Sequence, residues 1–327
     1  MSAAFSYRAC GLSCESDAPI AGLRVVPSEG RCDLTISMRG QEKTTRCLRP
    51  GTASVRYVSP EREESGVPVL TVLAGPDGYL LRYSEGASFL VDPRGGHVEV
   101  QWAPPLTEAD ASTYLLGPVL AFILRLRGTV PLHANAVVIE ERGVLFVGDA
   151  GAGKSSTAAV FAKMGYPVLS DDIVPIANAG GRALAYPSHP RLSVWPDSAD
   201  ALFGEHVALP FHSPSYPKPY LDILDAGYGF QHSPVPIGIV YVLGARSAAS
   251  RGCSSTPMDP RPALLALVRN TYCSYLLDAK MREREFDVLS QLVKQGPVRG
   301  LSFGDNLDSL ASSCRTLAME TRGAMVG

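Results

Sequence analysis

The chain carries little net charge, which limits the partners it can have. Its 327 residues include 30 Lys and Arg against 32 Asp and Glu, and charged residues make up 19% of the total. Nucleic-acid-binding domains gather positive charge on one face, and disordered acidic tails show as runs of one sign. This composition shows neither feature. We therefore expect no nucleic-acid partner and no role at an anionic membrane surface.

Long apolar runs are also missing. The longest candidate, residues 115–124, contains Gly117 and Pro118 and is too short to span a bilayer. The first residues, MSAAFSYR, lack the basic-then-apolar order of a signal peptide. We therefore expect a cytoplasmic protein without a membrane partner.

The cysteines fit neither a disulfide framework nor a zinc motif. There are seven, an odd number, and no two form a C-x-x-C pair. Scattered cysteines of this kind are expected to stay reduced. Four of the seven precede residue 50, so a redox or metal role for that segment remains an alternative.

What the chain does contain is a phosphate-binding loop. Residues 148–156, GDAGAGKSS, satisfy the pattern G-x-x-x-x-G-K-[ST]. The apolar run VLFV before them predicts a buried parallel strand, and TAAVFAKM after them predicts a helix. Glycines let backbone N–H groups curl around phosphate oxygens, and the helix N-terminus adds free donors. We expect Lys154 to reach the β- and γ-phosphates and Ser155 to ligate Mg²⁺, within a nucleotide site formed by Gly148, Asp149, Ala150, Gly151, Ala152, Gly153, Lys154, Ser155 and Ser156.

Two adjacent acids follow the loop helix. Residues 168–176, VLSDDIVPI, predict a strand that carries Asp171 and Asp172. In an open parallel sheet, ligands bind at the carboxyl ends of the strands. One carboxylate there can hold Mg²⁺ and another can accept a proton from an attacking hydroxyl. Neighbouring strand residues point to opposite faces, so both acids reach the site only if the chain bends there. The alternative is a solvated strand end.

The remaining patterns predict two domains, 1–104 and 105–327. Short alternating runs separated by turns make the first a small antiparallel β-rich domain, with strands at 23–26, 33–38, 67–72, 79–83 and 97–102. In the second, Thr107 is expected to cap a helix that ends at Gly128. Strands are expected at 130–140, 144–147, 168–176, 235–243 and 298–303. Helices are expected at 262–277, 281–293 and 306–320. The stretch 210–219 is expected to be a surface loop, and 245–260 a flexible connection.

Four motifs together resemble the HPr kinase/phosphorylase family. In order and spacing they are Pro131-Leu132-His133, the loop at 148–155, Gly165-Tyr166 and Ser170-Asp171-Asp172. The resemblance implies an α/β fold akin to phosphoenolpyruvate carboxykinase: a P-loop kinase core, here preceded by the β-rich domain and followed by a helical C-terminal region. It is specific over residues 130–200.

The same resemblance assigns roles to individual residues. It implies that Lys154 and Ser155 bind the triphosphate of ATP and Mg²⁺, and that His133 lies beside the transferring phosphate. It further implies that Asp171 or Asp172 is the catalytic base, and we expect Asp172 to join Ser155 as a metal ligand. HPr kinases are hexameric, so a homo-oligomer is implied as well.

The chain is also similar to bacterial HPr-kinase-like proteins that begin with a small β domain and carry P-R-L-x-x-W-P-D, here residues 190–197. Some of those relatives accompany ribosomal-peptide clusters, including lasso-peptide clusters, and phosphorylate a serine of the precursor peptide. Two departures from HPr kinase itself argue against HPr as the substrate and against the reverse reaction. Ser156 stands where glutamate is typical, and the Arg-Gly-Leu-Gly signature has no counterpart.

The expected function is therefore that of an ATP- and Mg²⁺-dependent kinase acting on a serine of a peptide or small protein. The alternatives are a small-molecule kinase, a carboxykinase-like decarboxylase, and a nucleotide-dependent regulatory module that binds a leader peptide through an edge strand of the β-rich domain. Arg191, Lys218 and Arg269 are candidates for binding an anionic substrate.

Overall fold

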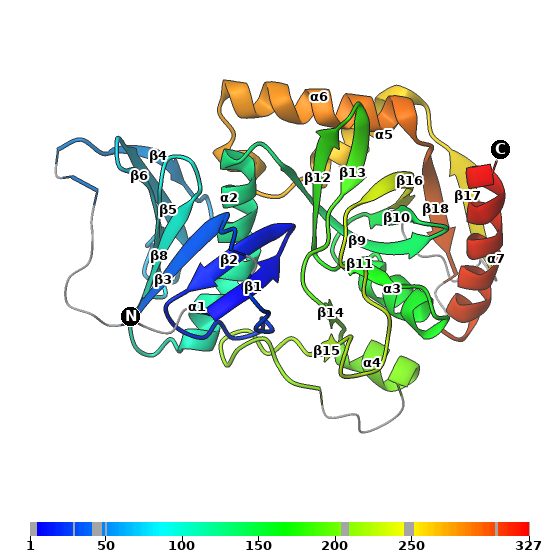
Figure 1. Cartoon of the computed structure of the whole chain (residues 1–327), viewed down its shortest axis with the longest axis horizontal. Helices are drawn as coiled ribbons and strands as arrows, with labels where there is room; N and C mark the ends of the chain where they lie inside the picture. Colours follow the sequence, from blue (N-terminus) through cyan, green and yellow to red (C-terminus); the bar gives the residue numbers. More distant parts are fainter. Residues whose placement is uncertain are drawn as a thin grey trace. The chain divides into compact units, whose positions relative to one another are not determined.

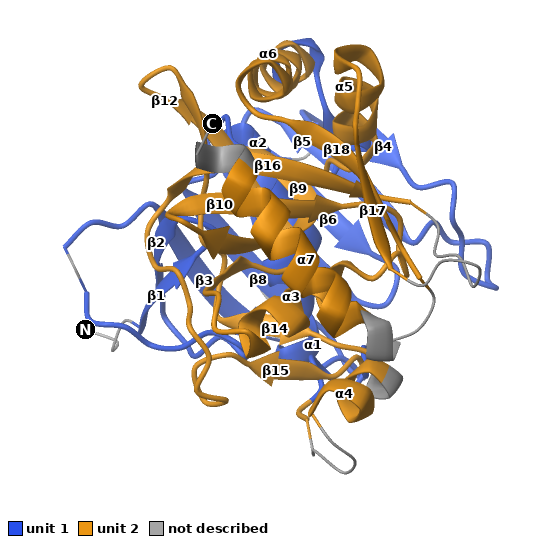
Figure 2. Cartoon of the chain, turned by 90° about the vertical axis from the view of Figure 1, so that its right-hand side faces the viewer, with its two compact units in different colours: residues 1–129, 211–217, 273–281 blue, residues 130–210, 218–272, 282–327 orange. Residues whose placement is uncertain are grey.

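The computed structural model describes residues 5–28, 30–40, 48–49, 51–203, 209–244, 252–304 and 307–326. The chain divides into two compact units (Figure 2). Unit 1 comprises Met1–Thr129, Phe211–Pro217 and Cys273–Met281, and unit 2 comprises Val130–Pro210, Lys218–Tyr272 and Arg282–Gly327. The helical stretch after Thr107 thus groups with the N-terminal sheet, and two short later segments join it.

Unit 1 is built on an eight-stranded sheet with the order β1-β2-β3-β8-β7-β6-β5-β4 (Figure 1). The strands are β1 (Phe5–Ala9), β2 (Leu12–Ser16), β3 (Leu34–Gly40), β4 (Ser54–Val58), β5 (Leu70–Gly75), β6 (Gly78–Tyr83), β7 (Ala87–Val91) and β8 (His97–Trp102). The pairs β2–β3 and β3–β8 are parallel, so the expectation of a wholly antiparallel domain was wrong. Parallel neighbours need long connections, and residues 17–33 provide one between β2 and β3. The run 23–26 lies in that connection and is not a strand.

The predicted helix of unit 1 is present, with a break inside it. It consists of α1 (Glu108–Tyr114), a π-helical turn (Leu115–Val119) and α2 (Leu120–Leu126). Thr107 caps it as expected, and the Thr107 N–H in turn donates to the Asp110 carboxylate at 2.7 Å. Gly117, with φ −97° and ψ −111°, breaks the regular geometry just before Pro118.

By length and composition, the described residues contain one helix that could cross a membrane, Glu108–Leu126, and 61% of its apolar window is buried inside the structure. The helix is longer than the run 115–124 considered from the sequence. Its Phe122 ring meets the Tyr79 ring of β6 edge-on, with centroids 5.1 Å apart. Both observations are typical of a core helix packed on a sheet.

Unit 2 is built on a second eight-stranded sheet. Its strands are β9 (Val130–Ile139), β10 (Arg142–Val147), β11 (Val168–Ser170), β12 (Ile173–Ala179), β13 (Arg182–Ala185), β16 (Val235–Leu243), β17 (Cys253–Pro257) and β18 (Val298–Phe303). Their order is β10-β9-β12-β13-β16-β18-β17, with β11 beside β9 and a further pairing of β10 with β16. Strand β10 is parallel to β16 but antiparallel to β9. The sheet is therefore mixed, and the strand before the loop, expected to be parallel, is parallel to one of its two neighbours.

Helices cover both faces of this sheet (Figure 1). They are α3 (Lys154–Lys163) and α7 (Leu307–Val326) on one side and α5 (Pro260–Arg269) and α6 (Ala279–Gln295) on the other. Alternate residues of β9 pack into the two cores on either side of the sheet. Val137 belongs to the first core, with α3 and α7, and Ala136 and Val138 belong to the second, with α5 and α6.

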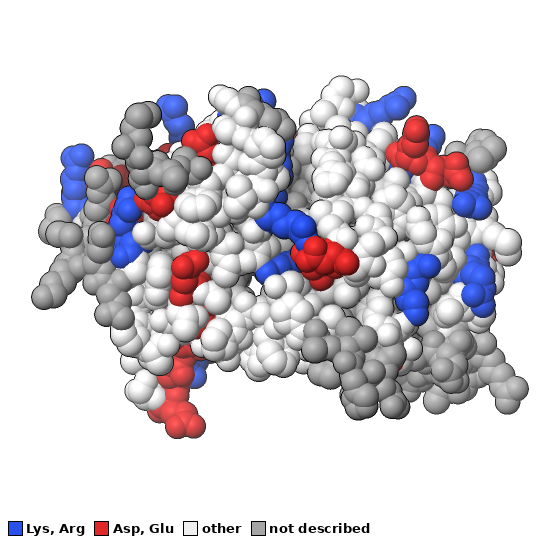
Figure 3. Space-filling model, turned by 60° about the horizontal axis from the view of Figure 1, so that its bottom comes forward, with Lys and Arg blue, Asp and Glu red and all other residues white. Residues whose placement is uncertain are grey.

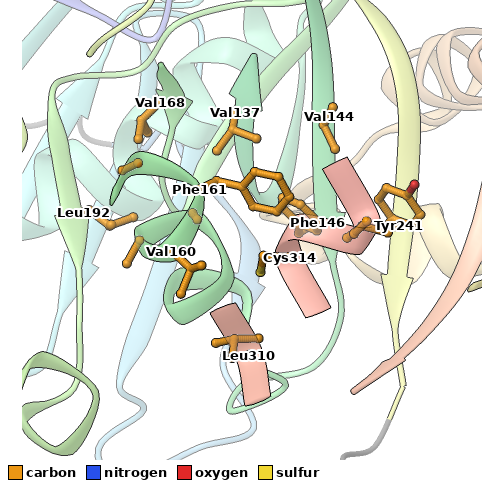
Figure 4. Packing of buried hydrophobic residues seen from close by; sticks show 14 of the residues in the cluster. Val137, Val144, Phe146, Val160, Phe161, Val168, Leu192, Tyr241, Leu310 and Cys314 are labelled. Carbon is orange, nitrogen blue, oxygen red and sulfur yellow. The ribbon is translucent and has the colours of Figure 1, made fainter. Parts of the chain in front are cut away.

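The first core is rich in aromatic rings (Figure 4). Phe146 of β10 lies 5.6 Å, between ring centroids, from Phe161 of α3, and it stacks on Tyr241 of β16 at 5.9 Å. Burial of such rings contributes a large share of core stability, and truncating one to alanine typically costs about 3–5 kcal/mol. This packing fixes α3, and with it the loop at 148–153, against the sheet.

Several predicted elements have different bounds in the structure. The expected strand 168–176 is two strands, β11 and β12, separated by Asp171 and Asp172. The helix expected at 262–277 ends at Arg269 and is followed by a 3₁₀ turn, Ser274–Leu276. The connection 245–260 contains β17, while residues 245–251 lie outside the described part. A short ladder joins β14 (Arg191–Ser193) to β15 (Tyr220–Asp222), and α4 (Pro196–Phe203) lies between them in the chain.

Charged side chains of both signs are interspersed with uncharged ones on the face shown in Figure 3. This distribution agrees with the formal net charge of −2.

Candidate functional site

The loop between β10 and α3 depends on glycine at three positions. Gly148, Gly151 and Gly153 have φ angles of +151°, +80° and +99°. A Cβ on Gly148 would lie 3.0 Å from the carbonyl oxygen of Leu243 and 3.2 Å from its Cβ. Gly153 is the N-cap of α3 in the left-handed conformation. The loop can thus take this shape only with glycine at its ends.

Lys154 is held inside the loop. Its Nζ donates to the carbonyl oxygens of Gly148 at 2.7 Å and Asp149 at 3.2 Å, and the residue is only 7% exposed. Burial lowers the pKa of Lys154, while the charges of Asp172 and Asp171 act in the opposite direction. The ammonium group therefore lies where phosphate oxygens would bind if the loop cradles a nucleotide.

The remaining loop residues differ in accessibility. Ser156 turns its hydroxyl toward α4, 3.1 Å from the Ser198 hydroxyl. Asp149, Ala150 and Gly151 are exposed, and Ala152, Gly153 and Ser155 are half-buried. Of the two serines, Ser155 is the one whose hydroxyl approaches the acid pair.

Asp171 lies beside Ser155. The Ser155 hydroxyl donates to Oδ1 of Asp171 at 3.4 Å, and the Asn135 side-chain amide donates to the same oxygen. The backbone N–H of Ser193 donates to the other oxygen, Oδ2, at 2.6 Å. Burial and the neighbouring Asp172 charge raise the pKa of Asp171. Its carboxylate is thus fixed by three donors next to the loop serine.

Asp172 has a different environment. Its backbone takes a left-handed φ of +66°, and the N–H of Ile173 donates back to the Asp171 carbonyl at 2.7 Å. This is the bend that both acids need in order to reach one site. Nδ1 of His133 lies 3.1 Å from Oδ1 of Asp172, whose side chain is 43% exposed. The Tyr272 hydroxyl donates to Oδ2 at 3.0 Å.

The pKa of Asp172 follows from these contacts. Burial alone would raise it, but the close approach and charge of His133, together with the charge of Lys218 and the Tyr272 hydroxyl, lower it. The two acids therefore have pKa values shifted in opposite directions. Such separation is typical of carboxylates with different roles in one site.

The structure brings together the predicted residues His133, Lys154, Ser155, Asp171 and Asp172, all within unit 2. Sequence reasoning missed Asn135, although it follows His133 by two residues in β9 and so shares its face. Asn270 and Tyr272 were also missed. Asn270 accepts from the Gly148 N–H at 3.1 Å, and its own carbonyl accepts from the His133 N–H at 2.6 Å. Both residues follow α5, where no sequence signal marks them.

The three candidate cations have separate surroundings. Arg191 is buried, with its guanidinium 3.7 Å from the centroid of the Tyr220 ring, and Arg269 is exposed at the end of α5. Lys218 is half-buried and acts on the pKa of both Asp171 and Asp172.

The site has oxygen donors that suit Mg²⁺. Among the described residues, no group of three or more His, Cys, Asp or Glu side chains is arranged to hold a metal ion. Mg²⁺ beside a phosphate loop needs fewer protein ligands, because phosphate oxygens and waters complete its octahedron. The Ser155 hydroxyl and an Asp171 oxygen, 3.4 Å apart, are hard oxygen donors that fit this requirement.

Part of the chain is similar in sequence to a known kinase. The HPr kinase/phosphorylase of Lactobacillus delbrueckii subsp. bulgaricus is 32% identical over 79 residues. The chain resembles this kinase family. The aligned part is 24% of the chain and 25% of the relative, so the chain spans about a quarter of that protein's length. This match supports the resemblance seen in the motifs.

The other comparisons add no argument. No family model matches the chain. The structure of the Hpr(Ser) kinase/phosphatase from Coxiella burnetii overlaps 60% of the chain and 99% of its own, at 17% identity and a TM-score of 0.31. A TM-score this low does not establish a common fold.

Proposed function

We propose that the chain is an ATP- and Mg²⁺-dependent kinase that transfers the γ-phosphoryl group to a hydroxyl, with a serine of a peptide or small protein as the acceptor. One observation carries the proposal. The loop serine Ser155 contacts the buried Asp171, while the adjacent Asp172, turned by its left-handed backbone, presents a partly exposed carboxylate beside His133. A phosphate-binding loop, a metal-side acid and a base are thus close together.

In this proposal the loop amides and Lys154 bind the triphosphate, and Ser155 and Asp171 hold Mg²⁺. When bound, Mg²⁺ supplies positive charge that neutralises the phosphate oxygens. The assignment differs from the expected pair of Ser155 and Asp172, since it is Asp171 whose oxygen lies next to the serine hydroxyl. Asp172 is then free to act on the acceptor.

Asp172 would serve as the general base. The proton of the acceptor hydroxyl moves to its carboxylate as the hydroxyl oxygen forms a bond to the γ-phosphorus and the bond to the β–γ bridging oxygen breaks. ADP is the leaving group. His133 and Tyr272 orient the carboxylate from either side. Proton transfer of this kind typically contributes about 10²–10⁴-fold to the rate.

The acceptor is the finer part of the proposal. The similarity of residues 190–197 to peptide-cluster kinases favours a ribosomal or lasso precursor peptide, and Ser156 in place of glutamate favours an acceptor other than HPr. The reaction would take place in the cytoplasm, where ATP is available, and the enzyme would form a homo-oligomer as HPr kinases do.

One observation favours a second candidate, the regulatory module that binds peptides. Strand β4 lies at one end of the strand order of unit 1, with Val55 63% and Val58 41% exposed. An edge strand with exposed apolar residues can accept a peptide by strand addition.

The test is mass spectrometry of the purified protein incubated with ATP, Mg²⁺ and the short peptide encoded beside its gene, with Lys154→Ala as the control. The kinase proposal predicts a gain of one phosphate on a peptide serine, absent in the variant. Tight peptide binding without ADP release would favour the regulatory module. ADP release only with a hydroxylated metabolite would favour a small-molecule kinase.

A further inference from the structure

The ladder between β14 and β15 positions Lys218 near the site. Ser193 of β14 pairs with Tyr220 of β15, and the Val194 N–H extends the ladder by donating to the Pro219 carbonyl at 3.1 Å. The same Ser193 supplies the backbone N–H that holds Asp171. The register of the ladder therefore fixes the backbone of Lys218 relative to Ser193, whose N–H donates to Asp171.

The Lys218 side chain is available for an anion. Its ammonium lies 5.4 Å from the centroid of the Trp195 ring, a residue that is 58% exposed. Among the described residues, no hydrogen bond or ion pair to a carboxylate engages this ammonium. The aromatic face supports a cation that keeps its N–H donors free.

Electrostatics place the same cation toward the reacting groups. The charge of Lys218 acts on Lys154, Asp171 and Asp172, so its ammonium lies near all three. Lys154 approaches from the loop, whereas Lys218 approaches from the β14–β15 ladder. Two cations from different elements thus share one space with the acid pair.

We propose that Lys218 is a second phosphate-binding cation of this site and that it contacts the γ-phosphate of ATP. The inference rests on the proposed kinase function. Phosphoryl transfer depends mainly on positioning and on positive charge around the transferring group. Lys154 in the loop serves the β- and γ-phosphates, so a second cation that approaches the acid pair from the β14–β15 ladder would serve the γ-phosphate alone.

The experiment compares ATP with ADP. Calorimetry measures the Kd of the full-length protein for Mg·ATP and Mg·ADP in the wild type, Lys218→Ala and Lys163→Ala. Lys163 is a matched control, because its ammonium also lies over a ring, 5.7 Å from the Phe203 centroid, but on the far end of α3. Lys218→Ala should weaken ATP binding about tenfold or more and leave ADP binding within about twofold, as for loss of a charge-assisted hydrogen bond. Lys163→Ala should change neither.

The outcomes separate the inference from the function it rests on. If the wild type fails to bind ATP, the kinase proposal itself is wrong. If the wild type binds ATP but Lys218→Ala loses ATP and ADP affinity equally, or loses neither, only the Lys218 assignment is overturned. Lys218→Arg retains the charge and should recover most of the ATP preference, while thermal unfolding of each variant verifies that it is folded.

Discussion

At the scale of single residues, the two adjacent acids show how neighbours in sequence acquire different chemistry. Asp171 is buried under three donors, and burial raises its pKa. Asp172 is partly exposed, and its contacts with His133 and Tyr272 help to lower its pKa. A bend at a single positive φ angle produces this difference.

We predict that Asp172→Asn and Asp171→Asn have different effects. Asp172→Asn should lower the rate of phosphoryl transfer by about 10²–10⁴-fold with little change in the Kd for Mg·ATP, because it removes the proposed base. Asp171→Asn should raise the Mg²⁺ concentration needed for half-maximal activity, because it removes the charge of a proposed metal ligand. Steady-state kinetics over a Mg²⁺ series measures both.

Asp200→Asn is the control for this pair, since it neutralises an exposed acid on α4 of the same unit. Equal losses of binding and rate in both site variants would mean that the acids only support the structure.

At the residue scale, a motif with fixed spacing can be read from the sequence, whereas a nonlocal contact cannot. The loop pattern and the pair of acids pointed to Lys154, Ser155, Asp171 and Asp172, and the structure places these side chains together. Tyr272 reaches Asp172 across 100 residues of sequence. A contact of that kind leaves no local pattern.

At the scale of elements, the pattern of apolar residues predicted where the strands of unit 2 lie, but it did not predict whether neighbouring strands run parallel or antiparallel. The nearly continuous burial of β9 and β10 reflects two buried faces, and such an apolar run looks the same in sequence whether the neighbouring strand is parallel or antiparallel. In unit 1 the strands β1 and β2 escaped prediction because FSYRA and LSCES contain few β-branched residues.

The glycines of the loop between β10 and α3 yield a prediction at this scale. Gly148→Ala should lower the unfolding temperature and weaken ATP binding, because the new Cβ would lie 3.0 Å from a backbone oxygen at a φ of +151°. Gly151→Ala is the matched variant, as its Cβ would meet nothing within 4 Å, leaving only the left-handed strain of about 1 kcal/mol. Differential scanning calorimetry should rank Gly148→Ala as clearly the less stable. Equal unfolding temperatures for the two variants would mean that the contact between the new Cβ at residue 148 and the Leu243 carbonyl oxygen does not destabilise the loop.

The start of α1 yields a prediction about pH. Burial would raise the pKa of Asp110, but hydrogen bonds from Thr107, Ser215 and Ser213 lower it well below its usual value. A carboxylate with a depressed folded-state pKa stabilises the protein above its unfolded pKa of about 3.9, and this stability is lost as the pH falls toward the folded pKa.

Asp110→Asn should therefore cost about 1–3 kcal/mol of unfolding free energy at pH 7 and less in acid. Urea unfolding at pH 7 and near pH 3 measures the difference. Asp77→Asn, which removes a half-exposed partner of Arg49 in the same unit, is the control and should cost far less. A loss for Asp110→Asn that does not shrink in acid would contradict the assigned pKa shift.

At the scale of the whole molecule, the units are not consecutive in sequence. The chain contributes Phe211–Pro217 to unit 1 and returns to unit 2 at Lys218, and it leaves unit 2 again after Tyr272. Both residues at these crossings belong to the surroundings of Asp172. Sequence patterns suggested domains 1–104 and 105–327, because local composition carries no trace of two short segments that pack on a distant sheet.

These crossings lead to a prediction about a shortened chain. In unit 1, Tyr275 stacks on Tyr57 at 4.5 Å, the Leu276 carbonyl accepts from Arg56 at 2.6 Å, and the Ser215 N–H donates to Asp110 at 2.8 Å. A chain of residues 130–327 would leave these segments without partners and expose Cys273 and Leu276, which are 4% and 2% exposed in the full chain. Tyr272 and Lys218 would then lose the anchors that adjoin them.

We expect the 130–327 chain to unfold at a lower temperature than the full chain and to bind Mg·ATP at least about tenfold more weakly, because both flanks of the acid pair lose their restraint. The full-length variant Lys154→Ala is the control for the shortened chain. It should lose nucleotide affinity, but the unfolding temperature of unit 1 should not change. Thermal unfolding and calorimetry on the three proteins separate the two effects. If the 130–327 chain bound Mg·ATP like the full chain, unit 1 would serve the acceptor or a partner and not the nucleotide site.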